Sequence, residues 1–92
     1  MKKFESDLKK LLSTYDCELI NYQYFKKIFG NIVLKICCLG NDLNFVTDRG
    51  EISCNGVLLC TYEYIKKENK TTPQKLLEQI ELKLVEIQKN NK

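Results

Sequence analysis

The stretch Leu43-Asn44-Phe45-Val46-Thr47-Asp48-Arg49-Gly50-Glu51-Ile52-Ser53-Cys54 decides the fold of this 92-residue chain. Apolar and polar residues alternate within each half of this stretch, up to Thr47 and again from Ile52. Such alternation is typical of a half-buried strand. Between them, Gly50 can take the positive φ that a tight hairpin needs. The sequence therefore predicts two antiparallel strands joined by a turn at Asp48-Arg49-Gly50-Glu51.

The segments before this hairpin predict two further strands and a helix. Residues 32–39 form a β-branched, largely apolar run that is too short for a core helix, and they predict the central strand. From Cys17 onward the pattern has period two, with Tyr22 and Tyr24 on one face, which favours another strand. Ahead of Cys17, apolar residues recur at helical spacing and indicate an amphipathic helix. Its stripe consists of Phe4, Leu8, Leu11, Leu12 and Tyr15.

The segments after the hairpin end in a long helix, with one region that the pattern leaves open. Asn55-Gly56 can close a second two-residue hairpin or end the sheet before a short helix. Residues 57–68 fit either state, with a lean towards helix or mixed structure. Thr72-Pro73 supplies an N-cap and a proline at the first helical position, and it predicts a helix of about 18 residues. Its buried stripe consists of Leu76, Leu77, Ile80, Leu84 and Ile87.

These elements predict an α+β fold in a single domain that covers residues 1–92. An antiparallel meander of three to four strands is flanked by an N-terminal helix and a long C-terminal helix. With 43% hydrophobic residues, a chain of this length can bury a modest core without a metal. No apolar run approaches the roughly 18 residues of a membrane span, and the first residues turn acidic rather than apolar. We therefore expect a cytoplasmic protein with no membrane partner.

The composition also limits the chemistry that this chain can perform. It contains no histidine, which removes the commonest general base and the most frequent metal ligand. Four glycines form no nucleotide-binding pattern, so we expect no cofactor, no metal, no catalytic residue and no enzymatic activity. Five cysteines without a CxxC pair are expected to be reduced and mostly buried. The sequence therefore favours a binding function over catalysis.

Arg49 is the main functional clue, because it is the only arginine in a chain with fourteen lysines. Its rigid planar fork of donors suits recognition at a loop tip, although a simple ion pair with Asp48 or Glu51 is an equal alternative. Residues 36–65 carry this arginine against four carboxylates, which leaves a net charge of −3. We predict a partner-binding surface here. Its residues are Asp42, Asp48, Arg49, Glu51 and Tyr62.

A lysine cluster before the last helix gives a second candidate surface. Its members are Lys66, Lys67, Lys70 and Lys75. Lysines beside a helix N-terminus can contact phosphate groups. The formal net charge of the whole chain is only +3, well below the strongly basic footprint of most nucleic-acid-binding domains. A nucleic-acid partner is therefore the weaker of the two expectations.

The order of helix, antiparallel strands and long C-terminal helix, with Phe45-Val46-Thr47-Asp48-Arg49-Gly50-Glu51-Ile52 at a hairpin, resembles small bacterial immunity proteins. These proteins belong to contact-dependent growth inhibition and other polymorphic toxin systems. The resemblance implies a cytoplasmic protein without enzymatic activity that binds a cognate toxin domain and blocks its active site or substrate groove. It further implies that Asp48, Arg49 and Glu51 contact the toxin, with Asp42 and Tyr62 beside them.

The alternative is a small RNA-binding module. A helix, a three-stranded antiparallel sheet and a final helix also resemble the double-stranded RNA-binding fold, which places lysines at the start of its second helix. Lys66, Lys67, Lys70 and Lys75 fall near that place, but their order differs from the usual lysine motif and Pro73 interrupts it. The resemblance would imply phosphate contacts by these lysines.

Overall fold

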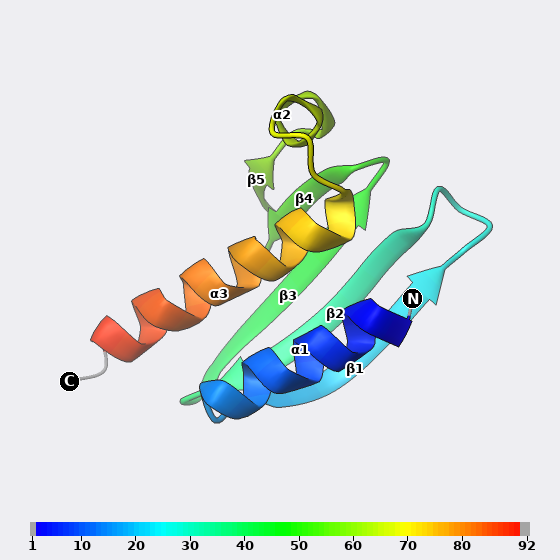
Figure 1. Cartoon of the computed structure of the whole chain (residues 1–92). Helices are drawn as coiled ribbons and strands as arrows, with labels where there is room; N and C mark the ends of the chain where they lie inside the picture. The colour runs from blue at the N-terminus through cyan, green and yellow to red at the C-terminus, as the bar shows by residue number, and fades with distance from the viewer. Residues whose placement is uncertain (1, 91–92) are drawn as a thin grey trace.

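The computed structural model describes residues 2–90 and contains one five-stranded antiparallel sheet with three helices (Figure 1). The α+β class is confirmed, with five strands where three or four were predicted. The helices are α1 (Lys2–Thr14), α2 (Tyr62–Lys67) and α3 (Thr72–Asn90). The strands are β1 (Glu18–Phe25), β2 (Asn31–Cys38), β3 (Asn41–Asp48), β4 (Glu51–Cys54) and β5 (Val57–Cys60).

Neighbouring strands follow one another along the chain, so the sheet is a meander of order β1-β2-β3-β4-β5. Two-residue turns close the last three hairpins at Leu39-Gly40, Arg49-Gly50 and Asn55-Gly56. In each turn both residues have positive φ, between 51° and 87°. Such turns match the right-handed twist of paired strands, and glycine takes the second position without steric cost. The predicted Asp48–Glu51 turn is therefore confirmed, whereas the β1–β2 connection is a longer hairpin loop, residues 26–30.

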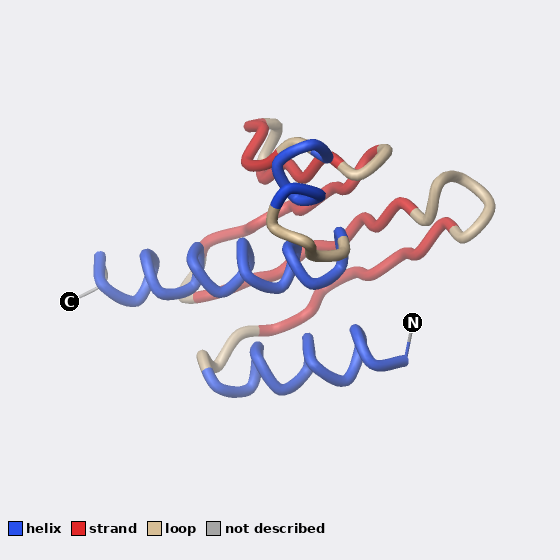
Figure 2. Tube along the Cα trace, turned by 45° about the horizontal axis from the view of Figure 1, so that its top comes forward, coloured by secondary structure: helices blue, strands red, loops and turns tan. Residues whose placement is uncertain are grey.

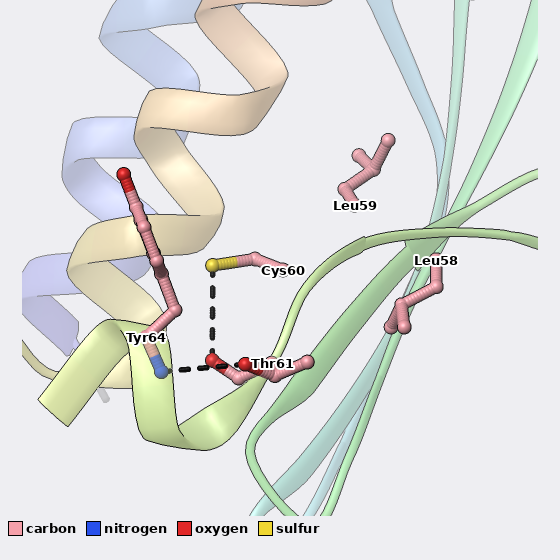
Figure 3. Close-up of a pocket in the computed structure, with 5 residues that line it drawn as sticks. All are labelled: Leu58, Leu59, Cys60, Thr61 and Tyr64. Carbon is pink, nitrogen blue, oxygen red and sulfur yellow. Dashed lines mark hydrogen bonds between the residues drawn. The ribbon is translucent and has the colours of Figure 1, made fainter.

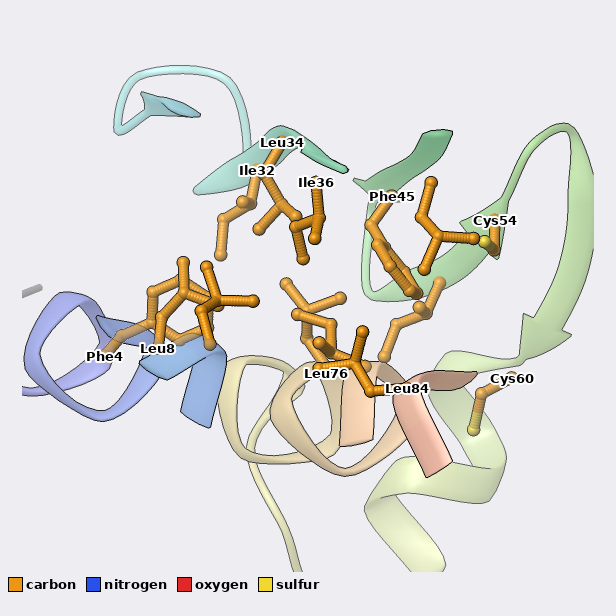
Figure 4. Packing of buried hydrophobic residues seen from close by; sticks show 14 of the residues in the cluster. Phe4, Leu8, Ile32, Leu34, Ile36, Phe45, Cys54, Cys60, Leu76 and Leu84 are labelled. Carbon is orange, nitrogen blue, oxygen red and sulfur yellow. The ribbon is translucent and has the colours of Figure 1, made fainter. Parts of the chain in front are cut away.

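Helices α1 and α3 cover the same face of the sheet, which gives the molecule two layers (Figure 2). Alternate residues of the strands point into the space between the layers, where Leu34 and Phe45 are fully buried. Leu8 of α1 and Leu76 of α3 meet them from the helical layer (Figure 4). This packing explains the period of two in the strands and the apolar stripes of the helices. No helix of the described part of the chain, residues 2–90, covers the other face of the sheet.

The region between β4 and α3 contains both a strand and a helix. Asn55-Gly56 closes a hairpin, so residues 57–60 pair with β4, and α2 then begins after Thr61. The side chain of Thr61 caps α2 by accepting a hydrogen bond from the backbone N–H of Tyr64 at 3.3 Å. A strand that leads directly into a capped helix explains why residues 57–68 fit both periods in the sequence.

Helix α3 begins at a capping box that lies one residue earlier than the sequence predicted. The Thr71 hydroxyl accepts from the backbone N–H of Gln74 at 3.3 Å, and the Gln74 side chain accepts from the Thr71 N–H at 2.9 Å. Each side chain thus satisfies a backbone donor of the other residue. Thr71 is therefore the N-cap rather than Thr72, and Pro73 lies inside the first turn.

Cysteine pairing differs from the sequence-based expectation. Glu18 lies opposite Cys37 in the β1–β2 register, which brings the neighbouring Cys17 and Cys38 together. They form a disulfide with their Cα atoms 4.7 Å apart, so the expectation of reduced thiols is wrong for this pair. Cys37, Cys54 and Cys60 are free. None of the helices described between residues 2 and 90 has the length and hydropathy needed to cross a membrane.

Candidate functional site

Two hairpin loops meet at one end of the sheet, and Asn31 joins them. The Asn31 side chain donates to the Asp48 carboxylate at 3.2 Å and accepts from the backbone N–H of Arg49 at 3.0 Å. The β1–β2 loop is thereby fixed beside the β3–β4 turn. We call this region the hairpin end and define it as residues 25–30, Asp48 to Glu51, and Tyr62.

Arg49 lies over the ring of Phe29, and this contact joins the two loops a second time. The guanidinium carbon of Arg49 is 5.1 Å from the ring centroid of Phe29, within cation–π range. Among residues 2–90, Arg49 forms no salt bridge with a carboxylate. The alternative in which Arg49 pairs with Asp48 or Glu51 is therefore not observed. The planar donor fork of Arg49 remains available to a partner molecule.

Tyr62 packs against the β3–β4 turn and holds α2 next to it. A Cβ atom added at Gly50 would collide with the Tyr62 ring, so only glycine fits at this position. Gly50 also has a φ of 87°, which other residues rarely adopt. Tyr62 itself remains 52% exposed. The structure therefore brings four of the predicted residues together at the turn, namely Asp48, Arg49, Glu51 and Tyr62.

The tip of the β1–β2 loop adds residues to the hairpin end that the sequence analysis missed. Phe29 is 72% exposed and Ile28 is 54% exposed, beside the exposed lysines Lys26 and Lys27. No salt bridge engages either lysine among residues 2–90. Apolar residues interleaved with lysines just before Gly30 are the signal in the sequence that could have identified them. The hairpin end thus combines exposed apolar side chains with three unpaired cations.

Asp42 lies away from the hairpin end, at the other end of β3. The six residue steps from Asp42 to Asp48 span about 20 Å of extended strand. Asp42 instead faces Lys35 on the uncovered face of the sheet, with a nitrogen–oxygen distance of 3.8 Å. The predicted surface is therefore not one cluster, because Asp42 is separated from the other four residues.

The uncovered face of the sheet connects these two ends. In the β2–β3 and β3–β4 registers, Val33 lies opposite Val46 and Val46 lies opposite Ser53, which forms a short row across the middle of the sheet. Val46 is 36% exposed. Asp48 and Glu51 lie opposite each other where this face meets the hairpin end. A partner bound at the hairpin end can therefore extend over an apolar centre with acidic groups at its border.

The four predicted lysines near the start of α3 do not form one exposed surface. Lys75 is only 6% exposed and forms salt bridges with Glu68 and Glu78, the latter at 3.7 Å. The hydrogen bond from Lys75 to Glu68 raises the pKa of the lysine above its ordinary value. The prediction is wrong for Lys75, because its ammonium is buried and already paired.

Lys70 is likewise engaged, whereas Lys66 and Lys67 are exposed. Lys70 bonds to the Glu78 carboxylate at 2.7 Å, and this hydrogen bond is the main cause that lowers the pKa of Glu78. Lys66 and Lys67 lie in the last turn of α2 and make no salt bridge among the described residues. Two exposed lysines next to two neutralised ones give much less positive potential than four free lysines would.

The free thiols and the carboxylates do not gather into a further site. Burial raises the pKa of the Cys54 and Cys60 thiols, which keeps them protonated and weakly nucleophilic at neutral pH. Among residues 2–90, no three cysteine or carboxylate side chains come close enough to hold a metal ion.

Searches with this chain found no matching family model, no matching curated protein and no matching solved structure.

Proposed function

We propose that this chain is a cytoplasmic immunity protein that binds a cognate toxin domain through its hairpin end and blocks the active site or substrate groove of the toxin. The observation that carries this proposal is the Arg49–Phe29 pair. Within the described range of residues 2–90, this arginine has no carboxylate partner and lies on an exposed aromatic ring where two hairpins are joined. Arginine and aromatic residues are the side chains that most often dominate protein–protein binding energy.

Preorganisation supports a binding role for this region. Asn31 fixes the backbone of Arg49, and Tyr62 packs on Gly50, so little conformational entropy remains to be lost on association. The side chain of Arg49 is held over Phe29 before any partner arrives. Rigid anchors of this kind convert buried area into affinity more efficiently than mobile lysines do.

The charges of the hairpin end favour specificity. Lys26, Lys27 and Arg49 are cationic, whereas Asp48 and Glu51 lie beside them on the uncovered face. A mixed pattern of this kind fixes the register of a partner, because displaced docking brings like charges together. The proposed toxin surface therefore carries acidic groups opposite the cations and a recess that accepts Phe29.

An RNA-binding role has less support. Lys70 and Lys75 are engaged by Glu78 and Glu68, which leaves Lys66 and Lys67 as the exposed members of the predicted cluster. A module for double-stranded RNA depends on contacts to phosphate groups, and two exposed lysines supply few of them. We therefore favour a protein partner.

The test is protection of cells in which the protein encoded by the adjacent reading frame is expressed. Wild-type chain is expected to restore growth, and Arg49→Ala is expected to lose protection because truncation of such an anchor weakens binding about 30-fold. Lys89→Ala is the matched control, since Lys89 is an exposed cation in the last turn of α3. Absence of protection by the wild-type chain would reject the proposed function.

A further inference from the structure

A second exposed apolar surface lies at β5, outside the hairpin end. Val57 is 63% exposed and Leu58 is 54% exposed, and Tyr64 of α2 is also 54% exposed. We call Val57, Leu58 and Tyr64 the β5 edge patch. Three large apolar side chains within eight residues of chain are exposed here, and the helical layer does not cover them.

The backbone of β5 is also unpaired on its outer side. Among residues 2–90, β4 is the only strand that pairs with β5, so β5 is an edge of the sheet. Cys54 and Val57 flank a two-residue turn, and the next pair is Ser53 with Leu58. Because hydrogen-bonded and non-bonded pairs alternate in an antiparallel ladder, the N–H and C=O of Leu58 point outward.

Strand β5 lacks the charges that usually protect an exposed edge. Its four residues, Val57-Leu58-Leu59-Cys60, include neither a charged residue nor a proline. The opposite edge, β1, contains Glu18 and the polar residues Asn21 and Gln23. The short length of β5 and the extra residue Leu59 in its register limit any added pairing to a few residues.

A cavity of about 270 Å³ opens between β5 and α2, beside this edge (Figure 3). The residues that line it are Leu58, Leu59, Cys60, Thr61 and Tyr64. Its volume is below the range of about 300–1,000 Å³ that is typical of small-molecule sites. It is therefore better suited to a side chain from an adjoining strand than to a separate ligand.

We propose that β5 is a self-association edge, at which a second copy of this chain pairs its own β5 antiparallel to the first. An apolar side chain from the second copy then enters the cavity between β5 and α2. The two copies are related by a two-fold axis, so each gives a side chain to the cavity of the other. The hairpin end is not used in this contact.

Three features favour a second copy over another occupant. An antiparallel strand is complementary to itself about a two-fold axis, and no charge on β5 opposes its own image. The adjoining helix α2 carries both signs, Glu63 in its first turn and Lys66 with Lys67 in its last turn. A rim with both signs allows unlike charges of the two copies to face each other.

The exposed area sets the expected strength of this dimer. Two aliphatic side chains and one aromatic side chain, each about half exposed, offer on the order of 300 Å² of apolar surface per copy. Two copies therefore bury roughly 600 Å² of side-chain surface plus the strand edges, which is small for a stable interface. We expect a reversible dimer with a dissociation constant on the order of 100 µM.

Sedimentation equilibrium of the full chain between about 10 µM and 1 mM tests this inference. We expect a reversible monomer–dimer equilibrium in the wild type and at least a tenfold weaker one in Leu58→Lys. Leu82→Lys is the matched control, because Leu82 is a leucine on α3 with a similar exposure of 61%. This variant should dimerise as the wild type does.

Two checks keep the outcome interpretable. Circular dichroism shows whether Leu58→Lys is folded, and Val57→Lys replaces it if it is not. Non-reducing electrophoresis excludes dimers linked by the free cysteines. A wild-type chain that stays monomeric at 1 mM would overturn the inference. The same result is expected if β5 binds a different protein rather than a second copy. A dimer unaffected by charge at Leu58 or Val57 would overturn it equally.

Discussion

Two groups of cations in this chain differ in their surroundings, although the sequence pattern predicts that both are exposed to solvent. At the hairpin end, Arg49 lies over Phe29, and no carboxylate forms a salt bridge with it among residues 2–90. In the first turn of α3, Lys75 is buried between Glu68 and Glu78. The first group is available to a partner, whereas the second holds α2 and α3 together. Clusters of charge in a sequence therefore do not reveal which charges are free.

The largest expected effect is a loss of stability when the buried Lys75 is replaced. Lys75→Ala removes the cation that lies between two carboxylates and 5.2 Å from the ring centroid of Tyr64, so we expect a loss of about 3 kcal/mol in the free energy of unfolding. Urea denaturation measures this loss. Lys66→Ala is the control and should change stability by less than about 0.5 kcal/mol. Equal stability of the two variants would contradict the structural role of Lys75.

Lys75→Met separates the contribution of charge from that of packing. Methionine keeps an apolar stem of similar length, and apolar replacements of buried ionic groups are often nearly neutral. We therefore expect Lys75→Met to be clearly more stable than Lys75→Ala in the same urea titration. A methionine variant as unstable as the alanine variant would show that the ion pairs dominate.

The second effect concerns the rigidity of the hairpin end. Gly50→Ala introduces a Cβ atom that collides with the Tyr62 ring, at a positive φ that alanine rarely adopts. We expect a loss of about 2 kcal/mol in stability, measured by thermal or urea unfolding. Gly40→Ala is a close control, because its φ is also positive and nothing lies within 4 Å of the added atom. It should cost only about 1 kcal/mol.

A smaller effect is expected for the cation–π pair itself. Arg49→Ala and Phe29→Ala, singly and together, form a double-mutant cycle for this contact. Because both side chains are partly solvated, we expect a coupling energy of about 0.5–1 kcal/mol. A coupling energy of zero in urea denaturation would show that Arg49 is not held over Phe29 in solution.

The smallest effect is a change in pH dependence. The pKa of Glu78 is lowered in the folded state, mainly by the hydrogen bond from Lys70, so its stabilisation is present above the ordinary carboxyl pKa. That stabilisation is lost as the pH falls through the lowered pKa. We expect Glu78→Gln to flatten the acid limb of the stability curve, measured by urea denaturation from neutral to acid pH. An unchanged acid limb would contradict this account.

Much of the fold follows from patterns that are local in the sequence. The alternation around Phe45, the Arg49-Gly50 turn and the stripe of α3 each report a period or a turn geometry, and the structure confirms all three. The Cys17–Cys38 disulfide was missed because it depends on the strand register, which single-segment patterns do not give. The sequence does not decide between strand and helix for β5, because its four apolar residues fit both the strand period and the helix period.

The candidate site was only partly predictable for a related reason. Asp48, Arg49 and Glu51 are close in sequence, so their proximity in space follows from the turn alone. Phe29 reaches Arg49 only through the pairing of β2 with β3, and no local pattern reports that contact. Local patterns do not report that Lys75 is paired, because its partner Glu68 lies seven residues before it, across the α2–α3 connection.

Affinity for the protein encoded by the adjacent reading frame, which we propose to be the toxin, tests the central claim most directly. In isothermal titration calorimetry, the hairpin-end account predicts tight binding by the wild type, about 30-fold weaker binding by Arg49→Ala, and no change in Lys89→Ala. Undiminished binding by Arg49→Ala, or a loss of affinity only when Lys66 and Lys67 are replaced, would contradict the account.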